Sequence, residues 1–242
     1  MDFEDVQRDW TRLGKEDPLW AVLIKPGTKD GHWDPDEFLA TGRVEVDAAL
    51  SRLRSVGGPE KFDSILDFGS GAGRLTQALA AHGSKVTGVD ISAPMIETAI
   101  SLDPGRTCEF VLNSRPDLSL FDDESFDLVY SSLVLQHMPK TVGTIFLEEM
   151  CRVLRPGGAL VIQVVSTPTF SVKGLAFRYA PRRLLGWAQT HLLKYPAPMH
   201  MQGYPDRKFK RIVESSLDVV DSETDETYGG HWVNRRHYAI KR

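Results

Sequence analysis

The 242-residue sequence predicts an α/β fold that is doubly wound around a mostly parallel seven-stranded sheet. Two observations support this prediction. From Ser64 onward, short and nearly continuous apolar runs alternate with helical patterns, which is typical of βαβ units whose strands are buried on both faces. A glycine-rich turn directly follows the first of these runs, as at the mononucleotide site of a doubly wound sheet.

Five apolar runs are the expected parallel strands. They are short and rich in Val, Ile and Leu, and they occupy residues 64–69, 85–90, 108–113, 126–132 and 159–165. Helical patterns lie between or after them, at residues 73–82, 94–101, 141–154 and 206–215. The turn sequence RPGG at residues 155–158 indicates the end of the third helix. The link at 114–125 is short and rich in turn residues, so no helix is expected there.

Two extended runs close the chain. Residues 216–228 and 231–242 are separated by Gly229 and Gly230, which predicts a C-terminal antiparallel hairpin. Because a parallel sheet is often closed by an antiparallel pair, these runs complete the seven strands.

An N-terminal segment of about 60 residues precedes the sheet. Asp34, Pro35 and Glu37 form a typical helix start, from which a helix should run to about Arg54. We expect residues 1–60 to form a helical lid over the main domain, residues 61–242.

Composition excludes several classes of protein. Apolar residues make up 41% of the chain and the net charge is −4, so the molecule as a whole is not a nucleic-acid binder. No apolar run approaches the ~20 residues of a membrane span, and the acidic N-terminus lacks the apolar region of a secretory signal. The two cysteines lack metal-ligand spacing. We therefore expect a cytoplasmic protein without a metal site.

Three closely spaced glycines mark the expected nucleotide site. In ILDFGSGAGRLT, residues 65–76, Gly69, Gly71 and Gly73 allow the backbone to approach a ligand closely. Asp90 ends the second strand, 23 residues after Asp67. In nucleotide-binding folds, a carboxylate at this spacing accepts hydrogen bonds from ribose hydroxyls.

The position of Asp67 favours one kind of nucleotide. This residue lies two positions before Gly69, where its carboxylate would repel the pyrophosphate of a dinucleotide and attract a cationic ligand. S-adenosylmethionine carries a ribose, a sulfonium and an ammonium group. The residues therefore favour this cofactor, and an oxidoreductase that binds a nicotinamide dinucleotide is the alternative.

With these motifs in order, the chain resembles the class I S-adenosylmethionine-dependent methyltransferases of the small-molecule type, from about Phe62 to Val165. ILDFGSGAGR resembles the first motif, VTGVDIS the second and FVLNSRPDL the adenine-side segment. FDLVYSSLVLQHM and EEMCRVLRPGGALVIQ resemble the stretches at the fourth and fifth strands. The resemblance implies a Rossmann-like methyltransferase domain and methyl transfer from S-adenosyl-L-methionine, without specifying the acceptor.

The resemblance also implies roles for residues along the cofactor. The methionyl side is expected to be lined by Asp67, Gly69, Ser70, Gly71 and Gly73. Asp90 is expected to bind the ribose diol. The remaining implied contacts are Ile91 and Met95 on the adenine, Asn113 and Ser114 near the adenine amine, and Ser131 near the sulfonium. The family often has an acidic residue where this chain has Asn113 and Ser114.

The N-terminal helix adds one expected cofactor contact. Arg43 is expected to pair with the cofactor carboxylate, and Arg74 is a weaker candidate for the same role. The alternative for Arg43 is a solvated helix face.

Two histidines are the candidate catalytic bases. His137 follows the fourth strand by about five residues, at the edge where the sulfonium is expected. His200 belongs to the segment expected to cover the pocket. Because a hydroxyl or amine acceptor must lose a proton, a base near the sulfonium would accelerate transfer. The alternatives are a structural role for His137 and an exposed loop position for His200.

A basic and aromatic insert is expected to shape the acceptor pocket. Residues 166–205 form an irregular segment, and from Ser166 to Arg211 there are nine Lys and Arg residues against one Asp. Such walls suit a flat, anionic or glycosylated small molecule, so we predict O-methylation of a sugar or other secondary metabolite. The alternatives are N-methylation of a small amine, a lipid-linked acceptor reached through membrane-surface contact, and a non-catalytic cofactor-binding module.

Overall fold

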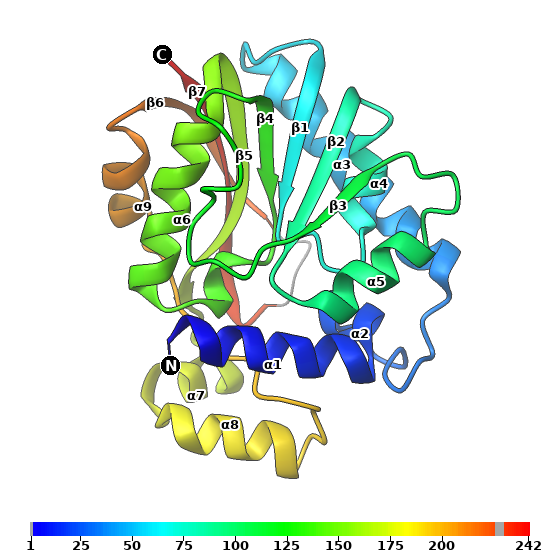
Figure 1. Ribbon diagram of the computed structural model, residues 1–242. Helices are drawn as coiled ribbons and strands as arrows, with labels where there is room; N and C mark the ends of the chain where they lie inside the picture. Colours follow the sequence, from blue (N-terminus) through cyan, green and yellow to red (C-terminus); the bar gives the residue numbers. More distant parts are fainter. Residues whose placement is uncertain (1, 226–229) are drawn as a thin grey trace.

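One sheet of seven strands organises the described residues, 2–225 and 230–242, of the computed structural model (Figure 1). The strand order is β3-β2-β1-β4-β5-β7-β6. The strands are β1 (Phe62–Phe68), β2 (Gly83–Asp90), β3 (Glu109–Leu112), β4 (Phe126–Ser131), β5 (Leu154–Pro168), β6 (Leu217–Thr224) and β7 (Trp232–Lys241).

The strand directions confirm the predicted mixed sheet. Strands β1 to β5 pair in parallel, and β7 is antiparallel to both β5 and β6. Strand order reverses between β1 and β4, so the carboxyl ends of these strands form the switch point at which such folds bind ligands. The predicted hairpin turn falls partly on residues 226–229, which lie outside the described residues.

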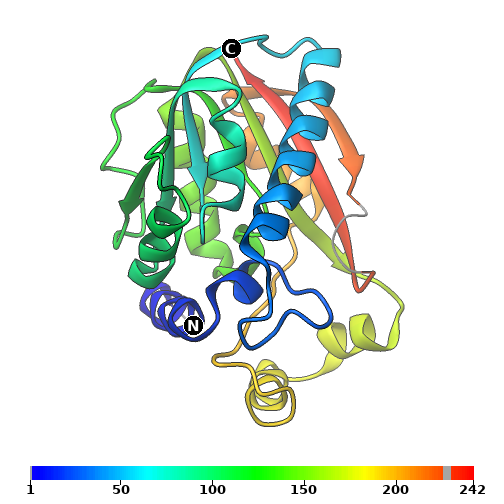
Figure 2. The same ribbon diagram turned by 90° about the vertical axis from the view of Figure 1, so that its right-hand side faces the viewer.

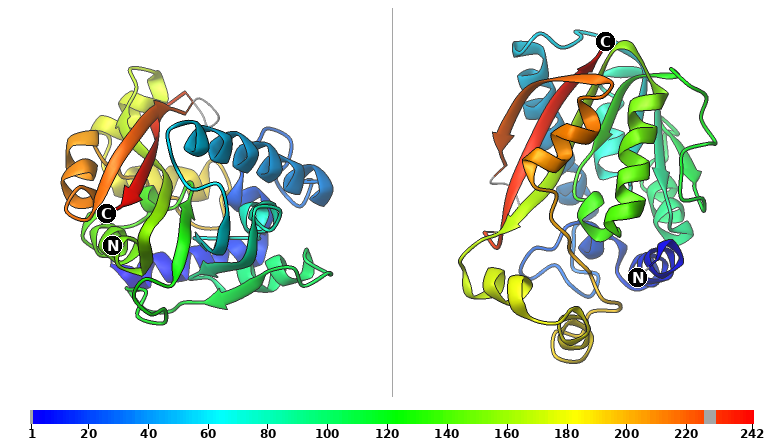
Figure 3. Two further views of the ribbon diagram at one scale, coloured as in Figure 1. Left: turned by 90° about the horizontal axis from the view of Figure 1, so that it is seen from above. Right: turned by 90° about the vertical axis from the view of Figure 1, so that its left-hand side faces the viewer.

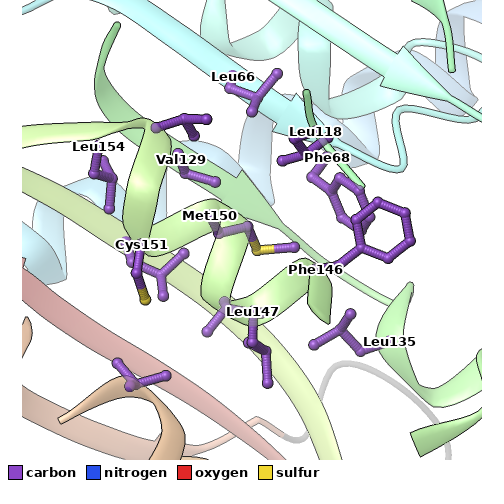
Figure 4. Packing of buried hydrophobic residues seen from close by; sticks show 14 of the residues in the cluster. Leu66, Phe68, Leu118, Val129, Leu135, Phe146, Leu147, Met150, Cys151 and Leu154 are labelled. Atoms are coloured by element: carbon purple, nitrogen blue, oxygen red, sulfur yellow. The ribbon is translucent and has the colours of Figure 1, made fainter. Parts of the chain in front are cut away.

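Helices cover both faces of this sheet. On one face, α3 (Pro35–Ser55) packs on α4 (Arg74–Leu79) and on β1, β4, β5 and β7. On the other face, α6 (Lys140–Val153) lies beside α9 (Asp206–Val213), as Figure 3 shows. Figure 4 shows the apolar side of α6 against the sheet, where Phe146 meets Phe68 with ring centroids 4.8 Å apart. The short α5 (Ala93–Ser101) follows β2.

The N-terminal 60 residues divide into two parts in the structure. The helices α1 (Phe3–Glu16) and α2 (Pro18–Val22) lie across the carboxyl ends of the strands (Figure 1). By contrast, α3 begins at the predicted cap, where Asp34 accepts from the Glu37 amide at 2.9 Å, and packs on the sheet. The lid predicted for residues 1–60 stays a proposal, and we propose that α1 and α2 supply it.

Part of the insert is helical, so its predicted irregular structure is wrong there, whereas residues 192–205 contain no helix or strand. It contains α7 (Val172–Tyr179) and α8 (Arg182–His191), which lie beyond α1 at the carboxyl end of the sheet (Figure 2). The prediction gave weight to the basic and aromatic residues and overlooked that the segment is rich in helix formers such as Leu, Ala, Arg and Gln. The expected turn at 155–158 is likewise part of β5, because Leu154 already pairs with Phe126.

The close contact of α3 with α4 predicts the effect of one substitution. A Cβ at Gly42 would collide with the Arg74 carbonyl, whereas Arg43 beside it is exposed. Helix propensity alone favours alanine over glycine, but here overpacking should dominate. We expect Gly42→Ala to lower the free energy of unfolding by about 1–3 kcal/mol in urea titrations, and Arg43→Ala to change it little. A Gly42→Ala protein as stable as wild type would contradict this packing.

Candidate active site

The glycine-rich turn between β1 and α4 takes a backbone shape that only glycine adopts readily. Gly69, Gly71 and Gly73 have φ angles of 77°, 51° and 82°. A Cβ at Gly69 would collide with Val134, and one at Gly71 would lie 2.6 Å from Val22. Strained conformation and close contact together explain why the sequence repeats glycine here.

Asp90, at the carboxyl end of β2, holds this turn in place. One carboxylate oxygen accepts from the Gly71 amide at 2.8 Å, and the other accepts from the Ser92 amide at 2.9 Å. Burial raises the pKa of Asp90, while these amide donors act in the opposite direction. The carboxylate therefore lies where strand, turn and α5 meet.

A largely apolar cavity lies beside the turn, beneath α1 and α2. Its wall includes seven of the residues predicted from the sequence: Gly69, Ser70, Gly71, Asp90, Ile91, Asn113 and His137. Four other predicted residues are buried in the same region without lining the cavity: Asp67, Gly73, Met95 and Ser131. Ser114 is exposed outside it, and His200 lines a second pocket.

Asp67 lies beneath the turn instead of on the cavity wall. Its side chain is fully buried, and one oxygen accepts from the Thr76 hydroxyl at 2.6 Å. The other oxygen has no hydrogen-bond partner among the described residues. Burial raises the pKa of Asp67 to about 7, because the charged form loses its hydration. The structure thus does not bring this carboxyl to the cavity surface.

Arg43 is exposed and does not line the cavity, so its expected pairing with the cofactor carboxylate stays a prediction. Gly42 and Glu45 face inward on α3, so the helical period turns Arg43 outward into solvent. Arg74, the weaker candidate, lines the cavity instead. Its guanidinium donates to the Glu45 carboxylate at 2.8 Å, and both side chains are buried.

Glu45 is the centre of a buried polar network that sequence reasoning missed. Besides Arg74, it receives hydrogen bonds from Ser132 at 2.8 Å and from Arg236 at 2.9 Å. Arg236 also pairs with Asp225 at 2.7 Å. The network ties α3 to residues after β4 and on β7, and Arg74 and Ser132 present it to the cavity. The sequence did contain one indication of this network, because Glu45 lies on the face of α3 that is otherwise apolar and buried.

The first two helices, within the segment predicted to form a lid, supply part of the cavity wall through residues that the sequence analysis did not single out. Phe3, Val6 and Trp10 of α1 line it, together with Val22 of α2. The three α1 residues recur at helical spacing, and this pattern in the sequence indicates a helix with one apolar face. These helices therefore cover part of the cavity.

His137 lines the same cavity as the glycine turn, and its ring orientation is fixed. Its Nδ1 lies 2.8 Å from the His200 carbonyl, so Nδ1 carries the proton and donates, leaving Nε2 as the acceptor. The Trp10 ring packs against it edge-on, with centroids 5.1 Å apart. Burial lowers the pKa of His137 to about 4, so the imidazole is neutral near pH 7.

The cavity meets the requirements of a nucleoside ligand with a polar tail. Ser70 lines it, and the buried Ser70 hydroxyl has no hydrogen-bond partner among the described residues. Such a group is costly unless a ligand or water satisfies it. Together with the Asp90 carboxylate and the apolar wall, it fits a ribose, a base and a methionyl tail. Fold and site thus define a nucleotide-binding enzyme of the doubly wound class.

Comparison with known proteins specifies that class. Residues 66–162 match the family model described as a methyltransferase domain. The 2-methyl-6-phytyl-1,4-hydroquinone methyltransferase of Synechocystis sp. is 39% identical over 155 residues, which are 63% of this chain and 48% of that protein. The ubiquinone biosynthesis O-methyltransferase of Xanthomonas euvesicatoria pv. vesicatoria is 28% identical, over 63% of this chain and 64% of that protein. The chain therefore spans about half to two thirds of these curated relatives.

Among solved structures, the fold is similar to magnesium protoporphyrin IX methyltransferase from Synechocystis PCC 6803, which was crystallised with S-adenosylhomocysteine (SAH). The TM-score is 0.65 at 18% identity, and the whole of both chains is covered. Residues 66–162 therefore match a methyltransferase domain, as the motifs predicted, and the predicted mostly parallel seven-stranded fold is confirmed.

The buried state of His137 predicts a pH dependence of stability. Its folded pKa is about 4, below the ordinary value of 6.5, so the unfolded chain binds the extra proton between these values. The stability lost through this group is zero above pH 6.5 and grows to on the order of 3 kcal/mol as pH falls towards 4. We expect His137→Gln to flatten the dependence of unfolding free energy on pH in this window.

The His137→Gln protein should still show some pH dependence of its unfolding free energy, because His237 also titrates in this window. It is fully buried, and burial also lowers its pKa to about 4. Equal slopes for wild type and His137→Gln between pH 7 and pH 4 would show that His137 is not held neutral.

Proposed function

We propose that this protein transfers the methyl group of S-adenosylmethionine to a small molecule, most specifically to a hydroxyl of a sugar or other secondary metabolite. The observation that carries the proposal is the cavity that is lined together by Asp90, the glycine turn and the neutral His137 ring. The family match supports methyl transfer, and we infer the chemical class of the acceptor.

The cofactor, when bound, supplies an activated methyl group on its sulfonium. In our proposal, Asp90 accepts hydrogen bonds from the ribose hydroxyls, and Ile91 packs on the adenine. The backbone of Gly69 and Gly71 adjoins the methionyl tail, and the Ser70 hydroxyl bonds to its polar end. The helices α1 and α2 exclude water, so that acceptor and methyl donor are held in alignment, which can supply roughly 7–11 kcal/mol.

His137 is the proposed proton acceptor for the hydroxyl. Its Nε2 carries the free lone pair because the His200 carbonyl holds the proton on Nδ1. The low pKa keeps the ring unprotonated at neutral pH but also makes it a weak base. We therefore assign His137 the role of orienting the hydroxyl and receiving its proton as the methyl group is transferred. His200 acts here through its backbone, holding the ring.

A lipid-borne acceptor is the second candidate, favoured by the surface of the insert. Large apolar side chains of α7, α8 and their flanks are exposed, among them Phe170, Val172, Tyr179 and Leu192. Residues 166–205 contain basic residues and no Asp or Glu. Apolar side chains beside basic ones are typical of contact with an anionic membrane surface. Among the described residues, no helix is both long and apolar enough to cross a bilayer.

A labelled-methyl transfer assay tests the proposed activity. The protein should transfer label from S-adenosylmethionine to at least one member of a panel of glycosides, phenols and phenolic acids, and produce SAH. Amines and lipid extracts form the other arms and represent the alternatives.

His137→Ala should lower kcat about 10²–10⁴-fold while leaving cofactor affinity within about twofold. Unchanged kcat would remove His137 from the proton transfer.

Asp90→Ala should weaken binding of SAH about 10- to 100-fold in calorimetric titrations. The reason is that hydroxyl groups buried against the protein lose a charged acceptor, worth about 1.5–3 kcal/mol. Glu97→Ala, an exposed carboxylate on the neighbouring α5, is the matched control and should bind as wild type does. Since Asp90 also holds the turn, circular dichroism must show both variants folded. Full affinity in folded Asp90→Ala would contradict the ribose assignment.

A further inference from the structure

A second pocket lies between the insert and the body of the domain. We call it the insert pocket and define it by Lys140, Phe177, Arg182, His200, Gln202 and Trp232, which line it with several neighbours. These residues come from the start of α6, from α7 and α8, from the segment that returns from the insert, and from the start of β7. Residues far apart in the sequence therefore form its walls.

Two exposed cations, Lys140 and Arg182, line the insert pocket. Neither Asp nor Glu is among its lining residues. Within residues 2–225 and 230–242, the Lys140 ammonium forms no ion pair or side-chain hydrogen bond in the structure. Arg182 donates only to the neutral Gln202 amide, at 3.3 Å. Such uncompensated charge in a concave site favours an anionic ligand.

The two cations are also the first residues of two helices. Lys140 begins α6 and Arg182 begins α8, and the preceding residues are Pro139 and Pro181. Neither proline provides a side-chain cap, so the N-terminal amides of both helices lack that common partner. Because a helix N-terminus carries partial positive charge, both helix ends add to the field of Lys140 and Arg182.

Aromatic rings form another part of the same wall. Phe177 and Trp232 lie with ring centroids 5.6 Å apart and their planes tilted by 50°. The indole nitrogen of Trp232 is buried and has no hydrogen-bond partner in the described part of the chain. A planar ligand with an acceptor atom would match this combination of ring faces and a free N–H donor.

The insert pocket adjoins the cavity that holds His137. The His200 carbonyl accepts the His137 Nδ1 proton at 2.8 Å, and the Gln202 side chain donates to the Met138 carbonyl at 2.8 Å. His137 and Met138 line the cofactor cavity, whereas His200 and Gln202 line the insert pocket. The segment that holds His200 and Gln202 therefore contacts the cavity residues on one side and lines the insert pocket.

We propose that the insert pocket binds the carboxylate end of an aromatic acid acceptor, with Lys140 and Arg182 reading the charge and Phe177 and Trp232 contacting the ring. This inference rests on the proposed methyltransferase function and names its substrate class. The planar fork of Arg182 suits the two oxygens of a carboxylate. The reacting hydroxyl then extends towards His137, while the carboxylate sets its position.

Calorimetry with matched pairs of probes tests this inference. The probes are 3,4-dihydroxybenzoate and 4-hydroxycinnamate, each with its uncharged amide, titrated into protein saturated with SAH. In wild type, at least one acid should bind about tenfold or more tightly than its amide, since a charged hydrogen bond is worth about 1.5–3 kcal/mol. In Lys140→Met and Arg182→Met that preference should fall to about twofold or less.

Arg183→Met is the matched control, because Arg183 is adjacent on α8 and exposed but does not line the pocket. It should keep the wild-type preference, and all three variants should bind SAH as wild type does. The inference is overturned if no acid is preferred over its amide, or if the preference survives in Lys140→Met and Arg182→Met. Failure to bind SAH would instead count against the proposed function, so the two failures are distinguishable.

Discussion

The left-handed backbone of the glycine turn is the constraint on which the site depends. Gly69, Gly71 and Gly73 let the chain reverse sharply between β1 and α4 while Val134 and Val22 press on it from two sides. Asp90 then bonds the turn to the end of β2. Without this reversal, the carboxyl ends of β1 and β2 would not open onto one cavity, and α2 would have no surface to cover.

A second constraint acts on the buried face of α3. Glu45 lies in a buried position where an unpaired carboxylate would be costly, and two guanidinium groups and a hydroxyl compensate it. Since these partners belong to α4, β7 and the segment after β4, the network fixes how α3 sits on the sheet. It also explains why Arg74 and Ser132 hold defined positions on the cavity wall.

The fold was predictable from the sequence because its signals are local. Apolar runs mark the strands, and Asp34 with Glu37 marks the start of α3. The site was predictable where a residue sits in the turn or ends a strand, as Gly71 and Asp90 do. Side-chain direction was not: Arg43 faces solvent because its neighbour Gly42 packs on α4, and Asp67 turns under the loop to meet Thr76. Such outcomes depend on tertiary contacts between elements distant in sequence.

The same reason explains the missed parts of the site. Lys140 and Arg182 begin helices more than 40 residues apart, and only the folded chain brings them to one pocket. Aromatic and basic residues suggested an irregular insert, whereas α7 and α8 use them on helical surfaces. The sequence contained the charge excess, and the structure shows which of those charges line a concave site.

The central claim is that the cavity beside the glycine turn receives a cationic methyl donor rather than a dinucleotide. The most direct measurement is calorimetric titration of the wild-type protein with S-adenosylmethionine and, separately, with NAD⁺. Our account predicts saturable binding of S-adenosylmethionine at about one molecule per chain and no binding of NAD⁺. Binding of NAD⁺ by folded protein that does not bind S-adenosylmethionine would contradict it.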